Sequence, residues 1–107
     1  MSSLQYVDDN NFREMIDTSA VPVLVDFYAD WCPPCRRLTP LLETLSEQLD
    51  GQLRIVKLDV DNSSLASRFG VMNIPTMILF KDGQEVNRLI GNQSRARLMK
   101  ELTPHIS

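Results

Sequence analysis

The chain carries only two cysteines, Cys32 and Cys35, and two prolines stand between them. This spacing places both sulfurs within one helical turn, so a disulfide between them could open and close with little movement of the backbone. The pair follows an apolar run over residues 23–29 and precedes a segment in which apolar residues recur at helical spacing. We therefore predict a dithiol at the point where a strand ends and a helix begins.

The two sulfurs are expected to differ in chemistry because they stand at different positions of that helix. Cys32 falls at the cap position, where free N–H groups and the positive end of the helix dipole favour a thiolate. Cys35 lies one turn inside, where burial is expected to keep its thiol protonated. The pattern predicts that Cys32, an exposed thiol, attacks a substrate disulfide and that Cys35 resolves the mixed disulfide. Pro33 and Pro34 have no N–H, so the amide of Cys35 is the nearest remaining donor to the Cys32 sulfur.

Three other interpretations of the cysteine pair remain open. Zinc normally takes four Cys or His ligands, and the only other candidate is His105, so a metal site would require a second chain. A static structural disulfide that closes so short a loop would stabilise the fold little. The cysteines could also be inert core residues. Redox catalysis is favoured over all three, with no metal and no cofactor.

Length and charge exclude several other classes of protein. A chain of 107 residues is enough for one domain, which we expect to span residues 1–107. The net charge of −3 and the lack of a basic run argue against nucleic acid as a partner. Residues 1–11 contain no basic segment followed by an apolar stretch, so we expect no secretory signal, and no apolar run approaches the ~20 residues that span a bilayer. We therefore expect a cytoplasmic protein with no membrane contact, in a compartment where closely spaced cysteines are usually catalytic or metal-binding.

Hydrophobic periodicity predicts an α/β fold with nine elements in the order β-α-β-α-β-α-β-β-α. Strands are expected at residues 4–7, 23–29, 53–60, 76–80 and 85–90, with a turn at 81–83 in the last hairpin. Helices are expected on the stripe of Phe12, Met15 and Ile16, then over 34–49, 62–69 and 94–106. The parallel units come first and the antiparallel hairpin last, which predicts a central mixed sheet flanked by helices on both faces.

Several details of these elements follow from single residues. Asp26 alone interrupts the apolar run that suits a strand buried on both faces. Pro40 lies inside the second helix and is expected to kink it. Asn62 is expected to cap the third helix. The last helix is predicted to bury a stripe made of Ala96, Leu98, Met99 and Leu102.

Around the dithiol, residues 25–35 resemble the thioredoxin family. Residues 57–61, 74–76 and 80–83, together with Gly91, resemble it too, in matching order and separation from about Leu4 to the C-terminus. The resemblance implies a thioredoxin fold and a monomeric protein-disulfide reductase. Its partners would be disulfide-containing client proteins and a thioredoxin reductase that reduces it again.

The resemblance also implies roles for individual residues. Cys32 matches the family's attacking thiol and Cys35 its resolving thiol. Asp26 matches a buried acid that helps deprotonate Cys35, and Lys57 matches a lysine that lies near this acid and tunes it. Without the resemblance, Asp26 could be a strand residue with a satisfied hydrogen bond, and Lys57 a solvated lysine at a strand end.

A client-binding surface is implied by residues on either side of the dithiol. Pro75 matches the family's cis-proline, which lies against the dithiol and leaves the backbone before it free to pair with a client. Trp31 and Gly91 match positions of the apolar docking surface. The expected substrate-binding residues are Trp31, Pro33, Pro34, Ile74, Pro75 and Gly91.

Four positions depart from the commonest pattern of the family. Pro33 stands where glycine is usual, which leaves the redox potential open, and Tyr28 stands where tryptophan is common. Met72 and Asn73 replace a basic and a small residue in a loop that contacts partners. Two alternative functions therefore stay in view: a thioredoxin-fold binding module, and a more oxidising thiol–disulfide oxidase or isomerase.

Overall fold

The computed structural model describes residues 4–106, which form a five-stranded mixed sheet covered by helices. The strands are β1 (Gln5–Val7), β2 (Val23–Tyr28), β3 (Arg54–Asp59), β4 (Thr76–Lys81) and β5 (Gln84–Ile90). The helices are α1 (Phe12–Thr18), α2 (Pro33–Gln48), α3 (Leu65–Arg68) and α4 (Arg95–Leu102), with short 3-10 turns η1 (Val60–Asn62) and η2 (Thr103–His105). Each predicted strand end lies within one residue of the observed one.

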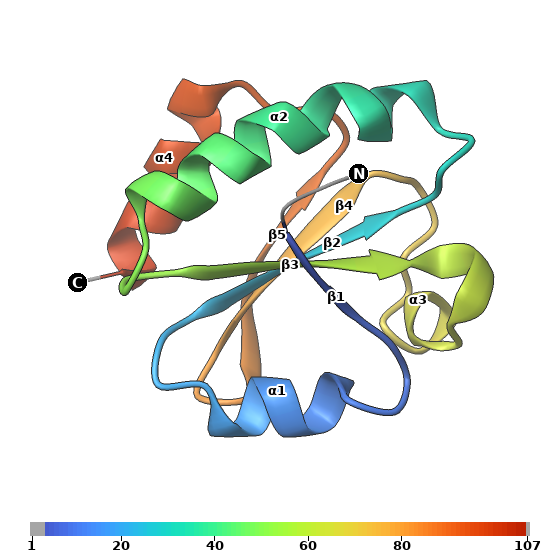
Figure 1. Cartoon of the computed structure of the whole chain (residues 1–107), viewed down its shortest axis with the longest axis horizontal. Helices are drawn as coiled ribbons and strands as arrows, with labels where there is room; N and C mark the ends of the chain where they lie inside the picture. The colour runs from blue at the N-terminus through green and yellow to red at the C-terminus, as the bar shows by residue number, and fades with distance from the viewer. Residues whose placement is uncertain (1–3, 107) are drawn as a thin grey trace.

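The strands lie side by side in the order β1-β3-β2-β4-β5. β2 is parallel to β3 and antiparallel to β4, and β4 forms the C-terminal hairpin with β5. Helices α2 and α4 cover one face of this sheet, and α1 and α3 cover the other (Figure 1). The expected α/β architecture with helices on both faces is therefore confirmed.

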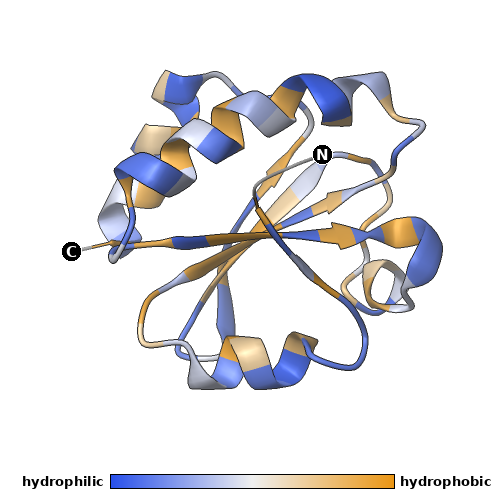
Figure 2. Cartoon of the chain, viewed as in Figure 1, coloured by the Kyte–Doolittle hydropathy of each residue, from blue (hydrophilic) through white to orange (hydrophobic). Residues whose placement is uncertain are grey.

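Alternation along β2 sorts its side chains between the two faces. Leu24 packs in the apolar cluster beneath α2 and α4, whereas Val25 and Phe27 pack in the cluster beneath α1 and α3. Asp26 and Tyr28 have the same parity as Leu24 and therefore face α2. Hydrophobic and hydrophilic residues alternate along the helices in Figure 2, as expected for elements with one buried face.

Turn chemistry fixes the ends of several elements. Asp82 and Gly83 both adopt positive φ, at 53° and 79°, which is the backbone of the tight turns that match the twist of a β-hairpin. Gly51, with φ of 84°, follows the C-terminal end of α2. That helix begins at Pro33, one residue before the predicted start, and continues through Pro40.

The prediction of one helix over residues 62–69 was wrong. Asn62 does not cap it: its side-chain amide donates to Asp59 over 2.9 Å and belongs to η1. The helix α3 starts later, behind Ser64, whose amide donates to the carboxylate of Asp9 over 3.0 Å. Asp59 also accepts a hydrogen bond from the backbone amide of Asp61, so two separate carboxylates satisfy backbone N–H groups of the two short turns.

The C-terminal helix is shorter than the predicted 94–106. Ser94 caps α4 by accepting a hydrogen bond from the amide of Arg97 over 3.1 Å. The chain then changes to η2, where Pro104 has no N–H to continue the α-helical ladder. Leu98 and Leu102 are buried as expected, but Ala96 is exposed and does not belong to the apolar stripe.

Candidate redox site

The dithiol lies where β2 gives way to α2. Cys32 is the N-cap of α2 with extended backbone, φ −96° and ψ 105°, and Pro33 takes the first helical position, where its fixed φ is already helical. Cys32 and Cys35 form a disulfide, with their Cα atoms 5.3 Å apart. The amide of Cys35 donates to the Cys32 sulfur over 3.2 Å, which confirms the expected donor.

Both cysteines are buried in the disulfide form. Cys35 is 1% exposed, as expected for the inner cysteine, but Cys32 is only 4% exposed. The prediction of an exposed Cys32 thiol was therefore wrong for this form. Tyr28 and Ala29 pack with the pair, and the half-buried side chains of Val60 and Ile74 lie against this cluster.

A second segment crosses the disulfide from the opposite side. The Ile74–Pro75 peptide bond is cis, as the resemblance implied. The carbonyl oxygen of Ile74 lies 3.9 Å from the Cys32 sulfur, and the carbonyl oxygen of Pro75 accepts a hydrogen bond from the amide of Gly91 over 2.7 Å. Cys32, Ile74, Pro75 and Gly91 are therefore brought together at one end of the sheet.

Trp31, the residue directly before Cys32, has an exposed side chain. Its side chain is 65% exposed, and its indole N–H donates to the carboxylate of Asp61 over 2.8 Å. Pro33 is exposed and Pro34 is half-buried next to it. Sequence reasoning missed the role of Asp61. The residue lies in one of the segments that resemble the family, but no spacing rule connects it with Trp31.

Asp26 is fully buried behind the dithiol, on the face that α2 covers. It pairs with Lys57 across β3 and with Met77 across β4. Burial raises the pKa of its carboxyl to about 7, and the charge of Lys57 opposes this rise. No side chain or amide of residues 4–106 donates a hydrogen bond to either carboxyl oxygen. The described residues therefore give no support to the interpretation of Asp26 as a satisfied strand residue.

Lys57 is buried as well, with 6% of its surface exposed, so it is not a solvated lysine at a strand end. Its Nζ lies 4.1 Å from the centre of the Tyr28 ring and 5.8 Å from that of Tyr6, and it donates to the hydroxyl of Thr39 over 3.3 Å. Within residues 4–106, no ion pair joins Lys57 to Asp26 within 4.0 Å. The lysine therefore acts on the acid through space rather than by direct contact.

The family model named Thioredoxin matches residues 3–104 of the chain. The chain belongs to the thioredoxin family. Among its relatives, the thioredoxin of Staphylococcus haemolyticus is 46% identical over 101 residues, which cover 94% of this chain and 95% of that protein. Thioredoxin 1 of a Nostoc species is 38% identical over 107 residues, 99% of this chain and all of that protein. A mutant thioredoxin from Halobacterium salinarum has a similar structure, with a TM-score of 0.87 and 37% identity over 97% of this chain and 90% of that chain.

Family membership decides the chemistry of the cysteine pair. Thioredoxins are thiol–disulfide oxidoreductases, and Cys32 and Cys35 are the Cys-x-x-Cys pair of this one. The chain is therefore a protein-disulfide reductase of the thioredoxin type. No group of three or more His, Cys, Asp or Glu in the described part of the chain could hold a metal ion. Within residues 4–106, no helix is long and apolar enough to cross a membrane.

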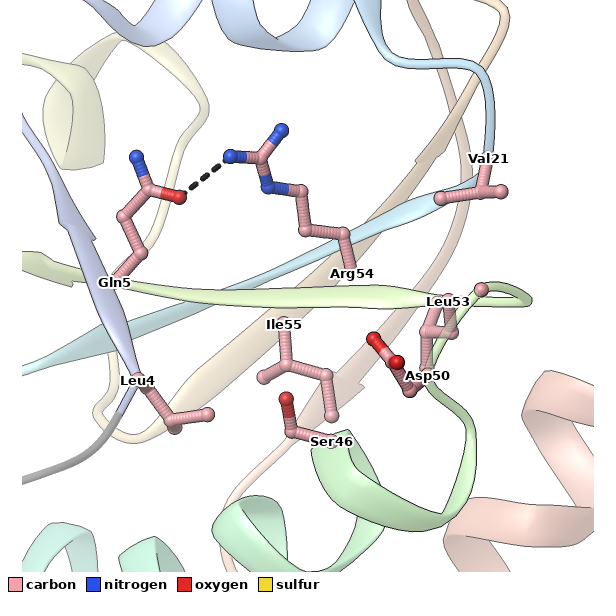
Figure 3. Close-up of a pocket in the computed structure, with 9 residues that line it drawn as sticks. Leu4, Gln5, Val21, Ser46, Asp50, Leu53, Arg54 and Ile55 are labelled. Atoms are coloured by element: carbon pink, nitrogen blue, oxygen red, sulfur yellow. Dashed lines mark hydrogen bonds between the residues drawn. The ribbon is translucent and has the colours of Figure 1, made fainter.

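A hollow of about 310 Å³ lies away from the redox site of this thioredoxin (Figure 3). Gln5 and Arg54 form a hydrogen bond along one side of it, and it is also lined by Ser46, in the last turn of α2, and by Asp50, just after that helix. Cys32 stands at the opposite, N-terminal end of the same helix. The hollow therefore contributes nothing to the thiol chemistry.

Proposed function

We propose that the chain reduces disulfides of client proteins by attack of Cys32, that Cys35 resolves the mixed disulfide, and that a thioredoxin reductase restores the dithiol. The observation that carries this proposal is the Cys32 sulfur at the N-cap of α2, where it accepts the amide hydrogen of Cys35. A helix N-terminus and an N–H donor both favour the thiolate, which is the attacking form.

The cycle transfers two electrons to the client. The Cys32 thiolate bonds to one client sulfur while the client S–S bond breaks and the other sulfur leaves as a thiolate. The deprotonated Cys35 then bonds to the Cys32 sulfur, which releases the first client sulfur as a second thiolate. The proton of Cys35, together with one proton from solvent that replaces the proton Cys32 lost on forming its thiolate, converts the two client thiolates to thiols. The Cys32–Cys35 disulfide is the oxidised product, and the reductase returns it to the dithiol with two electrons and two protons.

Asp26 is the residue we assign to proton transfer from Cys35. A general base works best when its pKa lies near the working pH, and burial brings the pKa of Asp26 to about 7. The acid also faces α2, the helix that carries Cys35. Lys57 is assigned to tuning, since its charge lowers the pKa of the same carboxyl.

Clients are proposed to dock around the rim of the site, where Trp31 and Pro33 are exposed and Pro75 is buried. The residues assigned to this surface are Trp31, Pro33, Pro34, Ile74, Pro75 and Gly91. The exposed indole of Trp31 supplies apolar area, and the backbone at Ile74 lies against Cys32, where an extended client segment would reach the sulfur. Exposed apolar side chains next to a buried disulfide suit clients whose own disulfide lies in an extended, accessible segment.

The same proposal covers the setting in which the chain acts. We assign it to the cytoplasm, as a monomer with one thioredoxin domain over residues 1–107 and no nucleic-acid or membrane partner. A net charge of −3 supports the exclusion of nucleic acid.

The test is reduction of insulin, with dithiothreitol as the electron source and then with a thioredoxin reductase and its donor. We expect the chain to accelerate reduction with either source and Cys32→Ser to abolish it. Full turnover by Cys32→Ser would contradict the mechanism. A strongly oxidising potential, titrated against glutathione, would instead favour an oxidase or isomerase.

A further inference from the structure

Thr39 connects Lys57 to the resolving cysteine. It lies on α2 one turn after Cys35, and its hydroxyl donates to the carbonyl oxygen of Cys35 over 3.2 Å. The same hydroxyl oxygen accepts the hydrogen bond from Nζ of Lys57 over 3.3 Å. One side chain therefore links the ammonium on β3 to the backbone of the redox helix. Because a charged donor polarises the hydroxyl, the two bonds in series reinforce each other.

The position of Thr39 matters because Lys57 is a buried cation. A charged group removed from water needs hydrogen-bond or charge partners. Within residues 4–106, the hydroxyl of Thr39 is the acceptor found within hydrogen-bond distance of Nζ. The faces of Tyr28 and Tyr6 add cation–π attraction, with the two ring centres 6.2 Å apart. These partners hold the ammonium on the side of Tyr28.

The buried anion on the same face is Asp26. It pairs with Lys57 in the sheet register, yet its oxygens receive no hydrogen bond from the described residues and Nζ stays beyond 4.0 Å. Burial raises the pKa of the Asp26 carboxyl, and the charge of Lys57 lowers it. Burial raises the pKa of the Tyr28 phenol, and Tyr6, Asp59, Asp30 and Asp26 raise it further. Cys32 and Cys35 pack in the same cluster as Tyr28. Lys57 therefore has two alternative partners, Thr39 with Tyr28 on one side and the carboxylate on the other.

We propose that Thr39 is a positioning residue of the redox site, which anchors Lys57 against Tyr28 and so withholds the ammonium from Asp26. This inference rests on the proton-transfer role proposed for Asp26. The anchored lysine still stabilises the carboxylate through space, but less than a direct ion pair would. The acid therefore keeps its proton closer to neutral pH, where it can exchange that proton with Cys35.

Replacement of the hydroxyl tests the proposal. In Thr39→Val, Lys57 loses its acceptor and the nearest buried anion is Asp26, so an ion pair forms. We expect the titration midpoint of Asp26, followed by carboxyl ¹³C NMR of the oxidised protein, to fall by about one pH unit, the lower end of the usual effect of an adjacent opposite charge. Thr39→Ser keeps the hydroxyl and should keep the parent midpoint.

Thr18→Val provides the matched control. The hydroxyl of Thr18 donates to the carbonyl oxygen of Glu14 over 2.7 Å, which is the same four-residue bond in another helix without a lysine. This variant should leave the Asp26 midpoint unchanged. An unchanged or raised midpoint in Thr39→Val would overturn the proposal, because a merely structural threonine has no reason to move it downward.

Two further variants keep the test decisive if Thr39→Val does not fold. Thr39→Ala should lower the midpoint in the same way. In a Lys57→Met background, the Thr39 substitution should produce no further shift, and a full shift there would contradict the coupling. Failure of the proposed function would be a separate result. It would be shown by insulin reduction in the Cys32→Ser variant, whatever the titration midpoint of Asp26.

Discussion

The indole N–H of Trp31 donates a hydrogen bond to the carboxylate of Asp61 over 2.8 Å, although the Trp31 side chain is 65% exposed. Asp61 is itself held in η1, where its amide donates to the carboxylate of Asp59 over 2.9 Å. An exposed indole without a partner would occupy several rotamers. The bond to Asp61 therefore orients the apolar indole next to Cys32, and on the proposed docking surface this orientation would lower the entropy cost of client binding.

Removal of this bond should weaken client binding more than the chemical step. For Asp61→Ala we expect the KM for insulin to rise roughly fivefold, the equivalent of about 1 kcal/mol for one hydrogen bond, with kcat nearly unchanged. Trp31 is the only tryptophan, so its fluorescence anisotropy reports the change directly and should fall. Asp61→Asn keeps an acceptor oxygen and serves as the control. Unchanged anisotropy in Asp61→Ala would show that the bond does not hold the indole.

Asp26 should make the oxidised protein less stable as the pH rises. Its pKa is about 7 in the folded chain against 3.8 for the ordinary carboxyl, so the folded state binds the proton more tightly than the unfolded state. The stability is complete below about pH 4 and is lost as the pH rises through about 7. At 1.4 kcal/mol per pKa unit, the loss in the free energy of unfolding is roughly 4 kcal/mol. Denaturant unfolding at a series of pH values measures it.

Asp26→Asn isolates this contribution, because it removes the titrating group and keeps the size of the side chain. The variant should be more stable than the parent at about pH 8, and the difference between the two proteins should shrink toward about pH 4. Parallel stability curves for parent and variant would mean that Asp26 titrates at an ordinary pKa.

Much of the site could be predicted because its signals are local. The Cys-x-x-Cys spacing, two prolines compatible with a first helical turn and a single acid in an apolar strand each follow from a few adjacent residues. The strands were predicted well for the same reason, since alternation and turn residues such as Asp82 and Gly83 act over short distances.

The features that could not be predicted depend on contacts between distant residues. The sequence pattern predicts only that Thr39 lies in an amphipathic helix. The hydrogen bond from Lys57 of β3 to its hydroxyl exists only in the folded chain. The start of α3 was wrong because Asp9, far away in the sequence, binds the amide of Ser64. Cys32 is buried because Tyr28 packs with it and Val60 and Ile74 lie against the same cluster. In each case a tertiary partner that no local pattern reveals decided the outcome.

Cys35→Ser should trap client proteins on Cys32. The variant keeps the attacking sulfur but lacks the sulfur that would displace the client, so the mixed disulfide accumulates. On non-reducing gels we expect adducts of the chain with insulin or lysate proteins whose disulfides are intact. Dithiothreitol should release all of these adducts. Cys32→Ser is the control and should form almost none, because the remaining Cys35 lies one turn inside α2 and lacks the cap position that favours a thiolate. Equal adduct formation by both variants would contradict the assignment of attacking and resolving roles.

Pro34 limits the number of donors to the Cys32 sulfur. An N-cap side chain accepts hydrogen bonds from the amide of the second or third helical residue. In α2 the second residue is Pro34, which has no N–H. The third is Cys35, whose amide donates to the Cys32 sulfur over 3.2 Å. Pro34→Ala supplies a second donor, and a donor to the charged form favours it. We expect the pKa of the Cys32 thiol in the reduced protein to fall by roughly half a unit to one unit, measured by the ultraviolet absorbance of the thiolate. Pro40→Ala, the same substitution deeper in α2, should leave that pKa unchanged, and an unchanged or raised value in Pro34→Ala would show that the missing amide does not limit the thiolate.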